Sequence, residues 1–290
     1  MRVLCAGHVN WDVTLRVDEL PEPDGEVSVE QRAQAGGGSA ANVSCTLAGL
    51  DVPTALFGSV GDDEEGLLAR NELDAFGVDV DHLVTVPNHE TTTKYLVVDG
   101  TGEVMVLSNT GANEAFTPDD LDPAVLARVD HLHLTSQRPA TAAHLAELAS
   151  EAGASVSFDP GRRIASRDYG RTLGDVDVLF LNEREARVLA EHATFDSLVR
   201  EATVVVKHGG QGATLHTRDG EVDHPGYPVT ALDTTGAGDA FAAGYIAART
   251  EGYDRALAVA NACGALAALQ VGARTAPTWD EVEAFLTEHA

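Results

Sequence analysis

The chain has 290 residues, with 46 acidic against 19 basic side chains and a formal net charge of −27 at pH 7. This acidity argues against partners such as nucleic acid or anionic membranes. No apolar stretch is long enough to span a membrane, and the apolar start at residues 3–6 is too short for a signal peptide. We therefore expect a cytoplasmic protein, with no linker or repeat dividing residues 1–290 into separate domains.

The basic residues are distributed unusually. Lys94 and Lys207 are the only lysines, and the other 17 bases are arginines. Acidic residues are scattered along the chain and do not form a tail. A solvated acidic surface with almost no lysine is typical of a protein adapted to high salt, where screening removes the self-repulsion.

Short apolar runs alternate with helical patterns along the chain. Strands are predicted at residues 2–6, 54–57, 156–158, 178–181 and 204–206. Helices are predicted at residues 39–50, 63–76, 140–152, 183–191, 237–250, 253–270 and 279–288. This order predicts an α/β fold, in which helices cover both faces of a mostly parallel sheet. Ligands bind such sheets beyond the carboxyl ends of the strands, where Asn10, Asp12, Asp159 and Asn182 follow apolar runs.

Two segments interrupt the alternation, at about residues 11–33 and 91–108. The second contains the strand-like run 93–98, which includes Lys94, followed by a turn at Asp99 and Gly100. Both segments favour β structure over helix. We expect them to be inserted into the α/β domain, either as a functional lid or as a hairpin on the sheet edge.

The glycine run at residues 36–38 precedes a helix of small residues whose apolar positions Val43, Leu47 and Leu50 have helical spacing. A second glycine-rich segment, Asp233-Thr234-Thr235-Gly236-Ala237-Gly238-Asp239, leads into another Ala-rich helix. Glycines allow backbone to approach a ligand, and the first amides of a helix attract anions. The second loop therefore suits a phosphoryl group, with Asp239 placed to take a proton from an attacking hydroxyl. The alternative is an ordinary helix capped by Thr234 or Thr235.

Together these two segments resemble the signature segments of the ribokinase-like (PfkB) family of carbohydrate and nucleoside kinases. The resemblance extends to Gly7-His8-Val9-Asn10-Trp11-Asp12, to Gly111-Ala112-Asn113 and to Leu181-Asn182-Glu183-Arg184-Glu185. It covers residues 2–286 in the family's order. It implies a three-layer α/β/α sandwich with a small β-sheet lid that closes over a sugar, and a possible homodimer formed through the lid.

The resemblance also implies roles for individual residues on the substrate side. Asp239 would be the general base, and the amides of Gly236, Ala237 and Gly238 would form the anion hole. The sugar hydroxyls would be bound by Asn10, Asp12, Gly37, Gly38 and Asn42. Lys94 and Arg163 would supply positive charge if the substrate were anionic.

On the nucleotide side, the resemblance assigns Asn182 and Glu185 to the hydration shell of Mg²⁺ near ATP. The alternative for this pair is a capped helix start. The nucleotide would also contact Lys207, Gly209, Gly210, Gly212 and, near the adenine, Asn261. Asp233 and Thr235 match positions that supply a monovalent-cation site, so K⁺ is a further expected cofactor.

Two departures from the family pattern concern the substrate. Gly161 stands where the family usually has asparagine, and Ser39 stands where ribokinases often have lysine. The lost lysine favours a neutral, furanose-like sugar phosphorylated by ATP on a primary hydroxyl. A nucleoside, a keto-deoxy sugar acid and a non-catalytic sugar- or nucleotide-binding regulator remain as alternatives, and a vitamin-B6-type or ADP-dependent kinase fits the motifs less well.

Neither the cysteines nor the paired histidines indicate a metal site. Cys5, Cys45 and Cys263 lie in apolar contexts without ligand spacing, so we expect buried free thiols. His131 and His133 alternate with leucines and would share one face of a strand. Without a third ligand, we interpret them as core or surface histidines.

Overall fold

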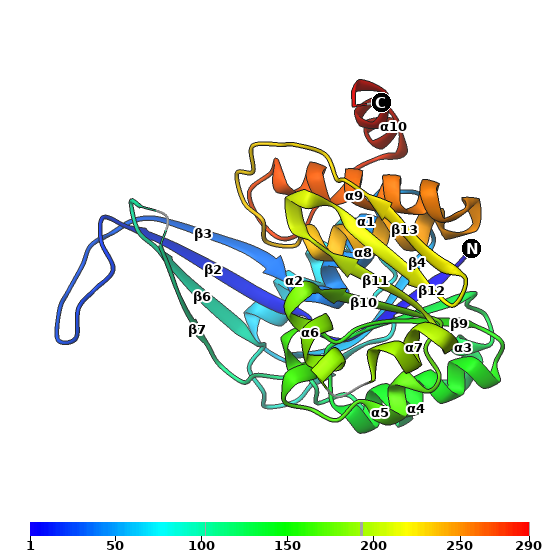
Figure 1. The fold of residues 1–290 in the computed structure, drawn as a ribbon. Coiled ribbons are helices and arrows are strands. Elements are labelled where there is room, and N and C mark those ends of the chain that lie inside the picture. The colour runs from blue at the N-terminus through cyan, green and yellow to red at the C-terminus, as the bar shows by residue number, and fades with distance from the viewer. Residues whose placement is uncertain (102, 192–193, 290) are drawn as a thin grey trace.

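A computed structural model describes residues 1–101, 103–191 and 194–289. Its larger sheet has nine strands in the order β13-β12-β11-β10-β9-β8-β1-β4-β5 (Figure 1). The strands from β11 to β5 run parallel, β12 is antiparallel to β11, and β13 is antiparallel to β12. Their bounds are β1 Val3–Ala6, β4 Thr54–Gly61, β5 Leu83–Val86, β8 His131–Thr135, β9 Ser155–Asp159, β10 Val178–Asn182, β11 Thr203–Lys207, β12 Ala213–Thr217 and β13 Gly220–His224.

Helices cover both faces of this sheet, because the parallel strands are apolar on both sides. One core contains Val3, Cys5 and Phe180 of the sheet. It is covered by α1 Ser39–Gly49, α2 Glu64–Ala75, α8 Ala237–Ala248 and α9 Tyr253–Ala268. The opposite core contains Leu4 and Leu179. It is covered by α3 Pro123–Leu126, α4 Pro139–Glu151, α5 Gly170–Leu173, α6 Glu183–Glu191 and α7 Phe195–Glu201.

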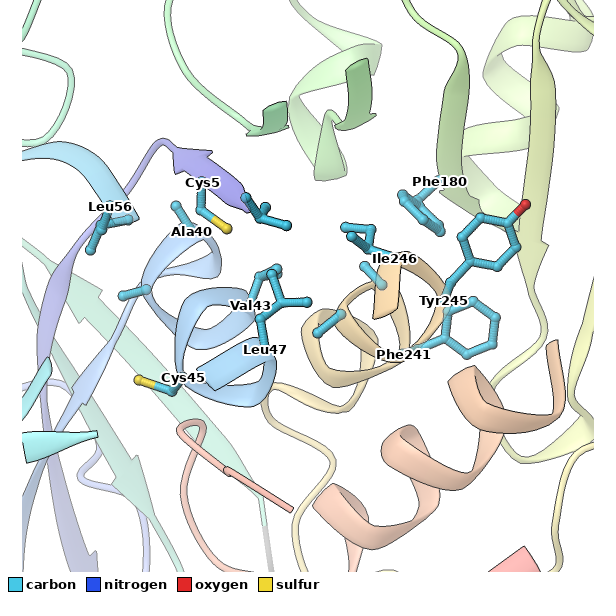
Figure 2. Close-up of a cluster of buried hydrophobic side chains, with 14 of the residues drawn as sticks. Cys5, Ala40, Val43, Cys45, Leu47, Leu56, Phe180, Phe241, Tyr245 and Ile246 are labelled. Carbon is cyan, nitrogen blue, oxygen red and sulfur yellow. The ribbon is translucent and has the colours of Figure 1, made fainter. Parts of the chain in front are cut away.

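Small residues allow the helices of the first core to approach closely. Figure 2 shows Val43 and Leu47 of α1 facing α8, which contributes Phe241 and Ile246. Between α8 and α9 the approach is closer still, since a Cβ at Gly244 would lie 2.8 Å from the sulfur of Cys263. The two glycine-rich segments that precede α1 and α8 are therefore held side by side. The last helix, α10 Trp279–Glu288, packs through Val282 and Phe285 in a cluster with residues of α8 and α9.

A second sheet of four strands, in the order β3-β2-β6-β7, projects from the side of the sandwich (Figure 1). Its strands are β2 Asn10–Val17, β3 Val29–Gly37, β6 Thr93–Val98 and β7 Val104–Ser108. This confirms the β structure expected at residues 11–33 and 91–108, although residue 102 lies outside the described residues. The boundary at residue 33 is wrong, because β3 continues through Gly36 and Gly37, which pair with Trp11 and Asn10.

The predicted strands and helices of the sandwich are confirmed, with ends that differ by a few residues. The sequence analysis had not predicted β5, β12, β13 or the short helices α3, α5 and α7. These elements are short or lie at the sheet edge, where the hydrophobic pattern is weakest.

The expectations for cysteine and histidine are also confirmed. All three cysteines are buried free thiols. His131 and His133 are fully buried on β8, and their rings bond to the hydroxyls of Ser155 and Ser157. Burial lowers the pKa of both rings, that of His133 to about 4. Among the described residues no group of three or more His, Cys, Asp and Glu side chains could hold a metal, and no described helix could cross a bilayer.

Candidate active site

Polar side chains gather at the carboxyl ends of the parallel strands, as expected. Lys207 ends β11, and its ammonium donates to Asp159, at the end of β9, over 2.6 Å. Burial disfavours the charge on Lys207, but Asp159 outweighs this effect and raises the pKa of the ammonium. The ammonium of Lys207 is therefore held in its charged form at this edge, paired with Asp159.

The glycine-rich loop before α8 lies against this charge. Gly236 begins the helix with a φ of 78°, and a Cβ there would lie 2.2 Å from the carbonyl oxygen of Ala273, so only glycine fits. The helix start has no side-chain cap, which removes the alternative of a threonine-capped helix. A Cβ at Gly238 would lie 3.4 Å from the Lys207 ammonium. The amide of Ala237 donates to Thr234, so the later amides of the first turn are the ones best placed for an anion.

Asp239 lies in the first turn of α8, and its carboxylate accepts a 2.7 Å hydrogen bond from the side-chain amide of Asn42 on α1. Loss of hydration is the main cause that raises its pKa to about 6. Repulsion from Asp159 adds to the rise, while the hydrogen bond from Asn42 and the charge of Lys207 oppose it. A carboxylate of this kind is ionised at neutral pH and close to the pKa that general-base catalysis favours.

The predicted sugar-binding residues meet where the two sheets join. A Cβ at Gly37 would lie 2.3 Å from a carboxylate oxygen of Asp12, and a Cβ at Gly38 would lie 2.4 Å from the carbonyl oxygen of His8. Asn10 is buried and accepts from the side-chain amide of Asn113. Burial raises the pKa of Asp12, opposed by Lys94, its neighbour on β6, and by Arg274.

Several buried polar atoms on this side lack a hydrogen-bond partner among the described residues. They include Oδ1 of Asp12, Oδ1 of Asn42, and Nε and Nη1 of Arg274. Native proteins seldom leave such atoms unsatisfied, so they indicate the place of a polar ligand. Arg274 was missed by sequence reasoning, since one arginine in the run 272–276 matches no motif. Its Nη2 donates to the carbonyl of Gly37 over 3.1 Å.

A corner of charged side chains adjoins Asn10. Glu114 accepts from His8 over 3.0 Å and from Arg167 over 2.9 and 3.1 Å. Arg163, in the 3₁₀ helix Gly161–Ala165, lies 3.6 Å from the same carboxylate. Burial alone would raise the pKa of Glu114, but the bonds from His8 and Arg167 lower it to about 2. The sequence analysis named Arg163 but not Glu114 or Arg167.

On the other side of the Asp239 loop lies a pocket of about 420 Å³. The predicted nucleotide contacts that line it are Asn182, Lys207, Gly209, Gly210, Gly212 and Asn261. Its volume is in the range of small-molecule sites, and Phe241 and Tyr227 add apolar walls. The structure therefore brings this whole group together.

Asn182 and Glu185 form a reciprocal cap at the start of α6. The amide of Asn182 donates to Glu185 over 2.8 Å, and the amide of Glu185 donates to the side chain of Asn182 over 3.0 Å. This is the alternative that the sequence analysis left open for the pair. Burial raises the pKa of Glu185, so the carboxyl lies where ionisation is costly without a cation nearby.

Asp233, just before the anion loop, connects that segment to the loop at Gly272. Its carboxylate accepts from the amides of Thr235 over 2.9 Å and Gly272 over 3.1 Å. Burial opposes ionisation, but these bonds prevail and lower the pKa of Asp233. The carboxylate is therefore charged beside the segment that carries Gly236 and Ala273.

Comparison with known proteins agrees with this arrangement. The model of the pfkB family of carbohydrate kinases matches residues 1–280. An ATP-dependent ribose-1-phosphate kinase of Halopiger xanaduensis is 56% identical over 99% of both chains, and a nucleoside kinase of Methanothermobacter thermautotrophicus is 28% identical over 87% of this chain and 84% of its own. The ribokinase structure of Thermotoga maritima aligns with a TM-score of 0.88 at 25% identity, covering 98% of this chain and 99% of its own. The chain therefore belongs to the pfkB family of carbohydrate kinases and is an enzyme of that class.

Proposed function

We propose that this protein transfers the γ-phosphoryl group of ATP to the 5-hydroxyl of ribose 1-phosphate. The 56% identity to the Halopiger enzyme, over the whole of both chains, carries the choice of substrate. This revises the neutral sugar that the missing lysine at Ser39 favoured in the sequence analysis. Arg163, which lies 3.6 Å from Glu114 with an exposed guanidinium, provides positive charge for the substrate phosphate.

The chemistry rests on Asp239 between the two glycine-rich segments. Its carboxylate takes the proton of the 5-hydroxyl while that oxygen forms a bond to the γ-phosphorus and the bond to the β-phosphate oxygen breaks. The products are ADP and the sugar bisphosphate. Lys207 and the later amides of the first turn of α8 stabilise the charge that develops on the transferred group.

The cofactor residues are assigned on the same basis. Mg²⁺ bound with ATP would keep most of its water, so Asn182 and the buried Glu185 would suffice to orient that shell. Asp233 and Thr235 would hold a monovalent cation, and its charge would help to fix the loop before Gly236. Closure of the small sheet over the sugar would exclude water that could otherwise accept the phosphoryl group.

The test is a substrate panel with the purified protein in molar KCl. Ribose 1-phosphate, ribose, nucleosides and a keto-deoxy sugar acid are each supplied with ATP and Mg²⁺, and ADP release and the phosphorylated product are measured. We expect kcat/KM for ribose 1-phosphate to exceed that for every other acceptor. A higher value for ribose or a nucleoside would overturn the substrate assignment, and binding without turnover would favour a regulator.

We also propose that two copies associate through the small sheet. Its outer strand β7 exposes a run of large apolar side chains, Val104, Met105, Val106 and Leu107. Such a patch is unusual on a monomer and suits a second copy of the same surface. Val106→Asp should convert a dimer to a monomer in light scattering, whereas a monomeric wild type would contradict the proposal.

A further inference from the structure

The corner formed by His8, Glu114, Arg163 and Arg167 has an excess of positive charge in a strongly acidic protein. One carboxylate faces two guanidinium groups. Four of the 17 arginines lie within residues 162–171, where Asp168 is the only acid. Within a chain of net charge −27, this is a local reversal of sign.

Arg163 and Arg167 differ in how many of their N–H donors form hydrogen bonds within the protein. Arg167 donates to both oxygens of Glu114 and to the backbone carbonyl of Gln137, so its guanidinium is committed to the protein. Among the described residues the Arg163 guanidinium forms one ion pair, with Glu114 at 3.6 Å and so beyond hydrogen-bond range, and its side chain is 47% exposed. Arg163 is therefore the cation of this corner that remains available to a ligand.

Two further observations point to a ligand here. Glu114 has a φ of 67°, a strained conformation for a residue other than glycine, and such strain is concentrated at functional sites. Gln137 is fully buried, and its Oε1 has no partner among the described residues. A side-chain amide can offer a ligand either a donor or an acceptor.

The corner is connected to the hydroxyl-binding residues. Asn113 precedes Glu114 and bonds to both Asn10 and the amide of Val9, while His8 follows Gly7 at the end of β1. In a furanose, the C1 substituent lies across the ring oxygen from C4, which carries the reacting C5. If the 5-hydroxyl of a sugar lies at Asp239 and its other hydroxyls lie at Asn10 and Asp12, its C1 substituent points away from all three residues. The corner beside Asn10 can receive that substituent.

We propose that Arg163 binds the C1 phosphate of the substrate, and that Glu114 and Arg167 are positioning residues that hold this corner in place. The inference rests on the proposed ribose 1-phosphate kinase activity. Lys94 is the rival cation, but it lies beside Asp12 in the register of β2 and β6, so its charge is directed at that carboxylate. Arginine also suits phosphate better, since its planar fork can donate two parallel hydrogen bonds.

The experiment compares Arg163→Gln with Arg162→Gln, a matched change at the adjacent exposed arginine. The KM of each variant is measured for ribose 1-phosphate, ribose and ATP at one fixed KCl concentration. We expect Arg163→Gln to raise the KM for ribose 1-phosphate roughly ten- to a hundredfold, the scale of a hydrogen bond to a charged group. Its KM for ATP and for ribose should stay within about twofold, and Arg163→Lys should restore part of the loss. Arg162→Gln should behave as the wild type.

The positioning role is tested with Glu114→Gln, which keeps the shape of the side chain. It should raise the KM for ribose 1-phosphate while the KM for ribose is unchanged, a split that general damage to the fold would not produce. Equal changes for both sugars would overturn the positioning role.

The outcomes separate the two proposals. A wild type that phosphorylates ribose 1-phosphate, with Arg163→Gln unaltered, overturns the phosphate site and leaves the proposed function intact. A rise in KM in Lys94→Gln alone would move the site to the small sheet and also overturn the inference. A wild type that does not use ribose 1-phosphate overturns both.

Discussion

The two sides of the active site satisfy their polar groups in different ways. On the nucleotide side, Asn182 bonds to Glu185, Asn261 to the carbonyl of Leu257, and Lys207 to Asp159. On the sugar side, buried oxygens of Asp12 and Asn42 and the Nε of Arg274 have no hydrogen-bond partner among the described residues. A site whose polar groups depend on the ligand rejects analogues that lack the matching group. Discrimination between substrates is therefore expected on the sugar side, and the nucleotide side contributes mainly shape and backbone.

The largest effect should come from the residue between the two sides. Asp239→Asn keeps a partner for Asn42 but removes the base, so we expect kcat to fall roughly 10²- to 10⁴-fold. Calorimetry should show ATP binding within about twofold of the wild type, because the amides and Lys207 remain. Turnover close to that of the wild type would remove Asp239 from the mechanism.

The next effect tests the sugar side directly. Asp12→Ala removes the carboxylate that we propose binds the sugar hydroxyls, and a hydrogen bond to such a charged group contributes about 1.5–3 kcal/mol. The KM for the sugar should rise roughly ten- to a hundredfold while the KM for ATP stays nearly constant. Asn261→Ala on the nucleotide side is the matched control, and its larger effect should be on ATP. An equal rise in KM for the sugar and for ATP in Asp12→Ala would indicate a damaged fold and would contradict the difference between the two sides.

The pH dependence of kcat/KM follows from the raised pKa of Asp239. A base must be deprotonated, so activity is expected to fall as the pH decreases through about 6, by about tenfold between pH 7 and pH 5. Unfolding should not account for this loss. A raised carboxyl pKa stabilises the fold as pH falls, and the stability due to the lowered pKa of Glu114, about 2, is lost only below about pH 4.5. A flat profile between pH 7 and pH 5, with folding checked by circular dichroism, would contradict the assignment.

The smallest expected effect concerns the cation beside the anion loop. Replacing K⁺ by a bulky organic cation at constant ionic strength should lower kcat several-fold without loss of fold, and Asp233→Ala should abolish the difference between cations. Bulk salt acts differently, because the net charge of −27 should make the thermal midpoint rise with any screening cation. Equal rates in every cation would leave Asp233 as a residue that only joins two loops.

The sequence predicts the sandwich well because its core strands are continuous apolar runs, such as Val3–Ala6, that alternate with patterned helices. It also predicts the nucleotide side, since glycines and strand-end polar residues occur there in recognisable order. The corner around Glu114 and the position of Arg274 were not predictable in this way. They depend on contacts between residues far apart in the chain, such as Arg167 with Glu114, and no local pattern records such a contact.

The hydrogen bond between Asn42 and Asp239 joins residues 197 positions apart. Asn42 and the glycine loop before α1 therefore leave the ribosome long before Asp239 has been synthesised. During most of its synthesis the nascent chain contains only one of the two glycine-rich segments. Contacts of such long range also slow folding, because the intervening chain must be ordered before they form. The pair can therefore form only late in synthesis, when α8 packs beside α1.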